Sequence, residues 1–210
     1  MKALILAAGP GKGLSPFTAT RPKAMINVGG RFLLENIIRL LREAGVNDLA
    51  VVVGHQRSKI TEYFGRGAEL GVNISYVYQE EPRGIADAIL RAREFFYGGE
   101  YFLLVYSDHL TVENIYLQAL ESFGSFRAPV ASICHTPEAM LYGNVYLDSQ
   151  MRISRIVEKP RREDLGNYVL AGVFVLPARF FSLLEEAPME RGLERLIAQE
   201  GLYASIWEGS

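Results

Sequence analysis

Short apolar runs alternate with helical periods along the first half of the chain, and this alternation constrains the fold more than any other feature. The run at 3–8 is too short for a helix and leads into glycines, so it predicts a buried strand. At 32–44 apolar residues recur on one helical face and charged residues on the other, which predicts an amphipathic helix that ends at Gly45. The alternation then predicts strands at 49–53, 74–78 and 101–105 and helices at 58–70 and 85–96.

This β-α-β-α-β-α-β order predicts an α/β fold, a Rossmann-like and mostly parallel sheet with helices on both faces. The strand-like runs after residue 129 are closely spaced, so we expect a β-richer C-terminal half. These runs lie at 130–135, 144–147, 153–158 and 168–176, followed by short helices at 178–184 and 189–200 and a last strand at 203–207. We expect a single domain over 1–210, with a first half at 1–128 and a second half at 129–210.

Charge and composition exclude several classes of partner. The 22 Lys and Arg residues nearly balance the 24 Asp and Glu residues, so no global basic field favours nucleic acid or an anionic membrane. The apolar run at 3–8 is far too short to span a bilayer, and no signal peptide is evident. Cys134 is the single cysteine, so no intrachain disulfide can form and we expect a cytoplasmic protein. The sequence leaves the oligomeric state open, a homo-oligomer included.

A glycine-rich loop, G-P-G-K-G at 9–13, follows the first predicted strand directly. Ligands of such sheets bind at the carboxyl ends of the strands, and glycines let backbone N–H groups approach a phosphate closely. The loop has neither the spacing of a phosphate-binding P-loop nor that of the dinucleotide-binding fingerprint. By itself it is compatible with a nucleotide site or with a flexible turn that binds nothing.

The loop belongs to a longer pattern, L-A-A-G-x-G-x-x-L-x-P-x-T-x-x-x-P-K at 6–23. This pattern resembles the signature of the sugar-phosphate nucleotidylyltransferases, which join a nucleoside triphosphate to a sugar 1-phosphate. The resemblance implies that Ala8, Gly9 and Gly11 contact the nucleotide and that Lys23, assisted by Lys12, meets its phosphates. A lysine ammonium after a proline suits that role, although a merely solvated Lys23 is the alternative interpretation.

A second pattern, Q-x-x-P-x-G-x-A-x-A at 79–88, resembles the base-binding segment of the same family. It implies that Gln79, Pro82 and Gly84 bind the base. A glutamine amide has one donor and one acceptor face, which suits the edge of uracil or thymine, so UTP or dTTP is favoured. The alternative is a polar residue at a strand end followed by a glycine at a helix entry.

Two acidic residues are implied as Mg²⁺ ligands. Asp108 follows the fourth predicted strand, where the family usually has Gly-Asp, and a carboxylate at that edge suits a cation that bridges phosphates. The family ends this region with W-x-D-x-G-T, whereas residues 207–210 are W-E-G-S, so Glu208 takes the place of the second ligand. The alternative for Asp108 is the N-cap of a following helix. The sequence leaves open whether the native chain continues past residue 210.

Three later segments resemble the sugar-binding half of the family: 142–145, 157–160 and 170–174. The resemblance implies that Gly143 presents its backbone amide to the sugar, Glu158 accepts from sugar hydroxyls, Lys159 meets the sugar phosphate and Gly172 keeps a strand close to the ligand. Read in isolation, the Glu-Lys pair is more typical of a solvated turn.

One departure leaves two functions open. The family usually has an arginine where this chain has Gly13, and Lys12 can restore the charge but not the planar fork of a guanidinium. The first interpretation is a Mg²⁺-dependent enzyme that transfers a nucleotidyl group from a nucleoside triphosphate to a sugar 1-phosphate. The second is a catalytically weak or silent subunit that binds a nucleotide or nucleotide-sugar. A glycosyltransferase is disfavoured because 107–109 is not Asp-x-Asp.

Overall fold

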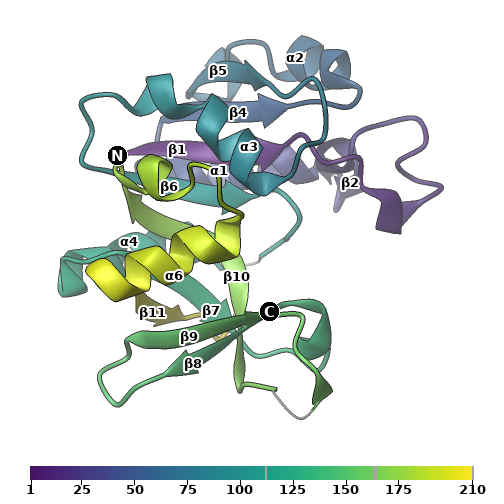
Figure 1. Cartoon of the computed structure of the whole chain (residues 1–210). Coiled ribbons are helices and arrows are strands. Elements are labelled where there is room, and N and C mark those ends of the chain that lie inside the picture. Colours follow the sequence, from purple (N-terminus) through teal and green to yellow (C-terminus); the bar gives the residue numbers. More distant parts are fainter. Residues whose placement is uncertain (112, 163–164, 210) are drawn as a thin grey trace. The chain divides into compact units, whose positions relative to one another are not determined.

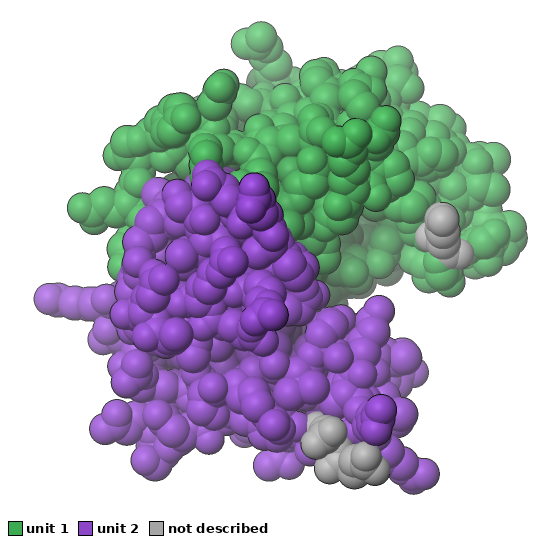
Figure 2. Space-filling view, in the orientation of Figure 1, with its two compact units in different colours: residues 1–110 green, residues 111–210 purple. Residues whose placement is uncertain are grey.

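The computed structural model describes residues 1–111, 113–162 and 165–209, and the side chain of Lys12 lies outside this description. Its contacts divide the chain into two units, unit 1 from Met1 to Leu110 and unit 2 from Thr111 onward (Figure 2). Among the described residues, none of the helices combines the length and the apolar character that a membrane span requires.

Unit 1 contains the predicted parallel sheet. Its strands are β1 (Lys2–Ala7), β4 (Asp48–Val53), β5 (Asn73–Tyr78) and β6 (Tyr101–Tyr106). They pair in the order β6-β1-β4-β5, and each of these pairings is parallel (Figure 1). The middle of each inner strand is fully buried, as expected for a parallel sheet that is covered on both faces.

Short helices and turns connect the strands of unit 1. They are α1 (Leu33–Glu43), α2 (Arg57–Phe64), α3 (Ile85–Arg91), the 3₁₀ turns η1 (Lys12–Leu14), η2 (Lys23–Met25), η3 (Ala68–Leu70) and η4 (Arg93–Phe96), and a small hairpin of β2 (Asn27–Val28) and β3 (Arg31–Phe32). The predicted apolar face of α1 is buried, and α3 packs against β1 (Figure 1). The α-helical extents predicted over 58–70 and 85–96 were too long, because each helix stops early and a tighter 3₁₀ turn follows.

Unit 2 is richer in antiparallel strands, as the spacing of its apolar runs predicts. It contains β7 (Val130–Cys134), β8 (Gly143–Leu147), β9 (Ile153–Glu158), β10 (Tyr168–Pro177), β11 (Tyr203–Ile206), α4 (Ile115–Phe126), α5 (Phe180–Leu183), α6 (Met189–Gln199) and the 3₁₀ turn η5 (Ala139–Leu141). β10 pairs antiparallel with β7 and β8, and β8 and β9 form a hairpin, whereas β11 lies parallel to β7 (Figure 1).

Among the described residues of unit 2, α4 is the one α-helix whose range was not predicted from the sequence. The Asn114 side chain accepts a hydrogen bond from the Leu117 backbone amide at 3.0 Å and caps the helix N-terminus. The helix packs on β7, β10 and β11, where it buries Ile115, Tyr116 and Ala119. An asparagine before apolar residues at 115, 116 and 119 was the available signal for this helix.

The strand order of unit 1 determines where a ligand can bind. The chain runs from β1 outward to β4 and β5 and then returns to β6 on the other side of β1. Open α/β sheets bind ligands at such a reversal, in the crevice outside the carboxyl ends of the strands. The loops that leave β1 and β6 are therefore the expected site.

Candidate functional site

The parallel register aligns the carboxyl ends of the strands of unit 1. Leu6 is level with Tyr106, while Ala7 is level with Val53, which in turn is level with Tyr78. The segments that begin at residues 8, 54, 79 and 107 therefore leave the sheet along one edge. Polar and glycine residues that are far apart in the sequence meet at this edge.

A cavity of about 400 Å³ lies at this edge. Apart from Lys12, every nucleotide-site residue that the resemblance implies in unit 1 lines it. These residues are Ala8, Gly9, Gly11, Lys23, Gln79, Pro82, Gly84 and Asp108. The structure thus brings together the glycine loop, the lysine, the base-binding segment and the acidic residue, whose roles remain predictions.

The loop after β1 is folded upon itself around Gly11. The Gly11 carbonyl accepts hydrogen bonds from the Thr18 hydroxyl and the Leu14 backbone amide, both at 2.9 Å. Gly11 has a φ of +63°, and a Cβ there would lie 2.8 Å from the Thr18 methyl group and 3.0 Å from Cβ of Lys23. Glycine is required at this position for both reasons, and it allows Lys23 to lie against the loop.

Lys23 is held in place from two sides. It begins η2, in which Ala24 and Met25 are buried against α1 and α2. Residues of the α2 region also bind the preceding segment: Gln56 Nε2 donates to the Ala19 carbonyl at 3.2 Å, and Lys59 Nζ donates to the Thr20 carbonyl. Buried apolar neighbours and these backbone bonds fix the stem of Lys23, which leaves its ammonium at the cavity.

Lys23 and Asp108 both line the cavity and form an ion pair there, with Nζ 3.4 Å from Oδ2. The Lys23 side chain is 26% exposed and that of Asp108 is 53% exposed, so both remain accessible to a ligand. The pair also lines a neighbouring hollow of about 750 Å³, which the loop residues Leu14 and Phe17 help to form. A phosphate group that enters here meets the cation and the anion together.

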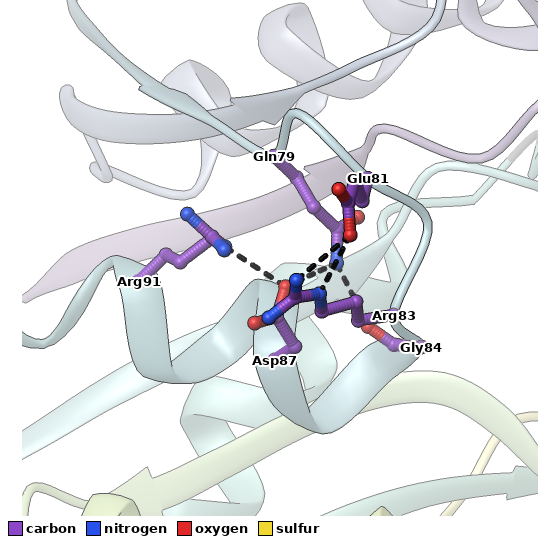
Figure 3. Close-up of polar contacts among 6 residues, drawn as sticks. All are labelled: Gln79, Glu81, Arg83, Gly84, Asp87 and Arg91. Carbon is purple, nitrogen blue, oxygen red and sulfur yellow. Dashed lines mark hydrogen bonds and ion pairs between the residues drawn. The ribbon is translucent and has the colours of Figure 1, made fainter.

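Gln79 lies at the end of β5 and is almost fully buried. Its Nε2 donates to the Gly84 carbonyl at 3.0 Å and to Asp87 Oδ2 at 2.8 Å, and the same carboxylate oxygen accepts from Arg91 Nε at 2.8 Å (Figure 3). The Arg91 hydrogen bond lowers the pKa of Asp87; burial opposes this effect and the Gln79 hydrogen bond adds to it. Asp87 is therefore ionised at neutral pH and acts as an acceptor.

In unit 2, the β8–β9 hairpin places Gly143 opposite Glu158. A Cβ on Gly143 would lie only 2.9 Å from Glu158 Oε2, so this strand position accepts no side chain without displacing the carboxylate. Burial, and secondarily the charge of Glu190, raises the pKa of Glu158, while Lys159 lowers it. The backbone amide of Lys159 donates to the Tyr142 carbonyl at 3.2 Å.

The other predicted residues of unit 2 lie in β10 and after β11. Gly172 has a φ of +75° and lies where the register of β10 shifts between Leu170 and Phe174. Glu208 follows β11 and is exposed. Among the described residues, no group of three or more His, Cys, Asp or Glu side chains could hold a metal ion.

A model of the family described as nucleotidyl transferase matches residues 2–198 of the chain. The chain belongs to the nucleotidyl transferase family. It is 32% identical over 196 residues to the low-salt glycan biosynthesis nucleotidyltransferase Agl11 of Haloferax volcanii, covering 91% of this chain and 54% of that protein. It is 31% identical over 195 residues to a glucose-1-phosphate thymidylyltransferase of Streptomyces antibioticus, with the same coverage of both. This nucleotidyl transferase family member thus spans about half the length of these curated relatives.

A solved UDP-glucose pyrophosphorylase in complex with UDP-glucose has the same fold. The TM-score is 0.90 at 24% sequence identity, and the alignment covers all of this chain and 91% of that one. This likeness supports the mixed α/β fold with a mostly parallel sheet that the sequence predicts.

Two departures from the family pattern have a structural account. Ser107, where the resemblance implies a glycine, donates its hydroxyl proton to the Leu6 carbonyl at 2.6 Å, which ties the end of β6 to β1. Gly13 lies in η1, and among the described residues other than Gly13 and its two chain neighbours, no atom lies within 4 Å of the position that a Cβ would take. The family member therefore has open space where its relatives are expected to carry an arginine.

Three residues that shape these sites had no role predicted from the sequence: Gly54, Asp87 and Asn144. Asn144 is fully buried; its Nδ2 donates to the carbonyls of Ala139 and Tyr142, and its Oδ1 accepts from the Gly166 amide. The side chain thereby ties the loop before Gly143 to the loop before β10. A polar residue beside a glycine in a strand-like run was the signal available in the sequence.

Gly54 follows β4 and separates the loops of its two neighbouring strands. A Cβ there would lie 3.0 Å from the carbonyl oxygens of Ala8 and Gln79, so Gly54→Ala forces the glycine loop away from the base-binding segment. We expect this change to destabilise the fold by about 1–3 kcal/mol and to lower Tm by roughly 3–10 °C in thermal unfolding. The control is Gly124→Ala in α4, where a Cβ meets nothing within 4 Å and Tm should stay constant or rise. Equal Tm values for Gly54→Ala and the unmodified chain would contradict the prediction.

Proposed function

We propose that this chain transfers a nucleotidyl group from a nucleoside triphosphate, with UTP or dTTP favoured, to a sugar 1-phosphate. An oxygen of the sugar phosphate attacks the α-phosphorus, the bond from the α-phosphorus to the bridging oxygen of the β-phosphate breaks, and pyrophosphate leaves. The products are a nucleotide-sugar and pyrophosphate. No general base is required, because a phosphate monoester is already ionised at neutral pH.

The observation that carries the proposal is the meeting of Gly9, Gly11, Lys23 and Asp108 at one cavity. Backbone N–H groups of the glycine loop and the Lys23 ammonium suit the oxygens of a triphosphate. The names of relatives, among them a glucose-1-phosphate thymidylyltransferase and a putative UTP-glucose-1-phosphate uridylyltransferase of Methanocaldococcus jannaschii, support the same class of substrate.

Asp108 has the chemistry of a Mg²⁺ ligand. A carboxylate that faces a polyphosphate is repelled by it unless a cation lies between them. Mg²⁺ in nucleotide sites is commonly held by one or two carboxylates together with substrate phosphates, which fits a single half-exposed aspartate better than an all-protein cage. Bound Mg²⁺ supplies charge neutralisation on the triphosphate. Asp108, with Glu208 as the proposed second ligand, would hold it, and Lys23 would bind the phosphate oxygens alongside.

Residues of unit 2 are proposed to bind the sugar 1-phosphate. The Gly143 backbone amide and the Glu158 carboxylate suit sugar hydroxyls, and the Lys159 ammonium suits the phosphate. Gly172 allows a strand to approach the sugar without a side chain. The positive φ of +44° at Lys159 turns the chain sharply after β9, which supports a site at this corner rather than a continued strand.

The proposal is tested by pyrophosphate release. The protein is incubated with Mg²⁺, each of UTP, dTTP, CTP and GTP, and a panel of sugar 1-phosphates. We expect release with UTP or dTTP that depends on both Mg²⁺ and the sugar 1-phosphate.

Gly13 favours a second candidate, a catalytically silent subunit that binds nucleotide or nucleotide-sugar. Nucleotide binding without release across the panel would overturn the enzyme and support that candidate.

A further inference from the structure

The amide of Gln79 has a defined orientation. Both partners of its Nε2, the Gly84 carbonyl and the Asp87 carboxylate, can only accept hydrogen bonds. A flipped amide would place Oε1 against these two oxygens, so Nε2 must face them. Oε1 is therefore the atom that Gln79 can offer to a ligand in the cavity (Figure 3).

Both partners are themselves fixed. Asp87 and Arg91 lie one turn apart in α3, a spacing at which opposite charges attract, and Arg91 Nε donates to the same oxygen that accepts from Gln79. Gly84 has φ +96° and ψ 179°, a conformation essentially restricted to glycine, and it directs its carbonyl at Gln79. The backbone amide of Gln79 continues the sheet by donating to the Val53 carbonyl at 2.9 Å.

We infer that Asp87, paired with Arg91, is a positioning residue that makes Gln79 present an acceptor to the base of a bound nucleotide. An acceptor suits a pyrimidine with an N–H at position 3, as in uracil and thymine. It opposes cytosine, whose N3 is itself an acceptor. The inference rests on the proposed function only in that a nucleotide occupies this cavity. Asp87 and Arg91 are absent from the cavity lining, so they act through Gln79.

The neighbouring ion pair provides a matched control. Arg83 donates to Glu81 Oε2 through Nε at 2.9 Å and through a terminal nitrogen at 2.8 Å, in the same segment (Figure 3). Neither residue contributes to the hydrogen bonds of Gln79 described above. Glu81→Leu thus removes a carboxylate from an ion pair, as Asp87→Leu does, without removing a partner of Gln79.

The test is calorimetric titration of the protein with UTP and with CTP in the presence of Mg²⁺. We expect the unmodified chain to bind UTP more tightly than CTP. Asp87→Leu should reduce the ratio of the two Kd values by about tenfold, because it removes one charge-assisted hydrogen bond, and Glu81→Leu should leave it unchanged. If Asp87→Leu does not fold, Arg91→Leu is used in its place. It is a milder change of a partly exposed side chain and should shift the ratio in the same direction.

The ratio of the two Kd values distinguishes positioning of Gln79 from a merely structural role of Asp87, because loss of a structural role would weaken the binding of both nucleotides equally. Equal weakening, or an unchanged ratio in both the Asp87 and Arg91 variants, overturns the inference. The inference is also overturned if the unmodified chain binds UTP and CTP equally, although that result leaves the proposed nucleotidyl transfer intact. Conversely, the protein could release no pyrophosphate and still show a preference for UTP that Asp87→Leu abolishes. That result supports the inference and overturns only the proposed transfer.

Discussion

Lys23→Met is expected to lower kcat/KM for nucleotidyl transfer by about 100- to 1,000-fold, the usual cost of removing a group that stabilises developing charge. Methionine retains most of the apolar stem that η2 positions and removes only the ammonium. The side chain is 26% exposed and its partner Asp108 is 53% exposed, so Asp108 left alone stays solvated and the fold loses little. The measurement is the rate of pyrophosphate release at several concentrations of the best nucleotide.

The control for this change is Lys2→Met. Lys2 begins β1, and its ammonium donates to the Phe95 carbonyl, a contact unconnected with the cavity lining. We expect Lys2→Met to release pyrophosphate at the unmodified rate. A Lys23→Met protein with less than about threefold loss, at an unchanged Tm, would show that the ammonium is not part of the phosphate site.

Gly13→Arg is expected to raise the rate of nucleotidyl transfer by about 10- to 100-fold. The position lies in a 3₁₀ turn two residues after Gly11, and nothing within 4 Å obstructs a Cβ. A guanidinium can engage two phosphate oxygens at once, which the point charge of a lysine cannot do. The change would therefore supply the bidentate contact that the resemblance implies at this position.

The matched control for Gly13→Arg adds the same charge elsewhere. Gly124 in α4 is exposed and equally free of obstruction, so Gly124→Arg tests the effect of an added guanidinium on the fold and on the net charge. We expect the Gly124 variant to match the unmodified chain. A Gly13→Arg protein that binds nucleotide no more tightly and turns over no faster would favour the silent binding subunit over the enzyme.

The candidate nucleotide site was largely predictable because its parts are ordered along the sequence. The glycine loop, Lys23, Gln79 and Asp108 each follow a strand or lie in a recognisable pattern, and parallel strands bring their carboxyl ends to one edge. The role of Gly54 could not be predicted in this way, since it depends on the close approach of residues 8 and 79, which are 71 positions apart in the sequence.

The existence and order of most strands and helices could be predicted from the order of the amino acids, because hydrophobic periodicity is a property of consecutive residues. The family could be predicted in the same way, through motifs that keep their order along the chain. The folded chain was needed to learn where the helices stop, that Ser107 ties two strands together, and how the Gln79 amide is oriented. These outcomes depend on hydrogen bonds between side chains and backbone groups that folding brings together, and such contacts have no period in the sequence.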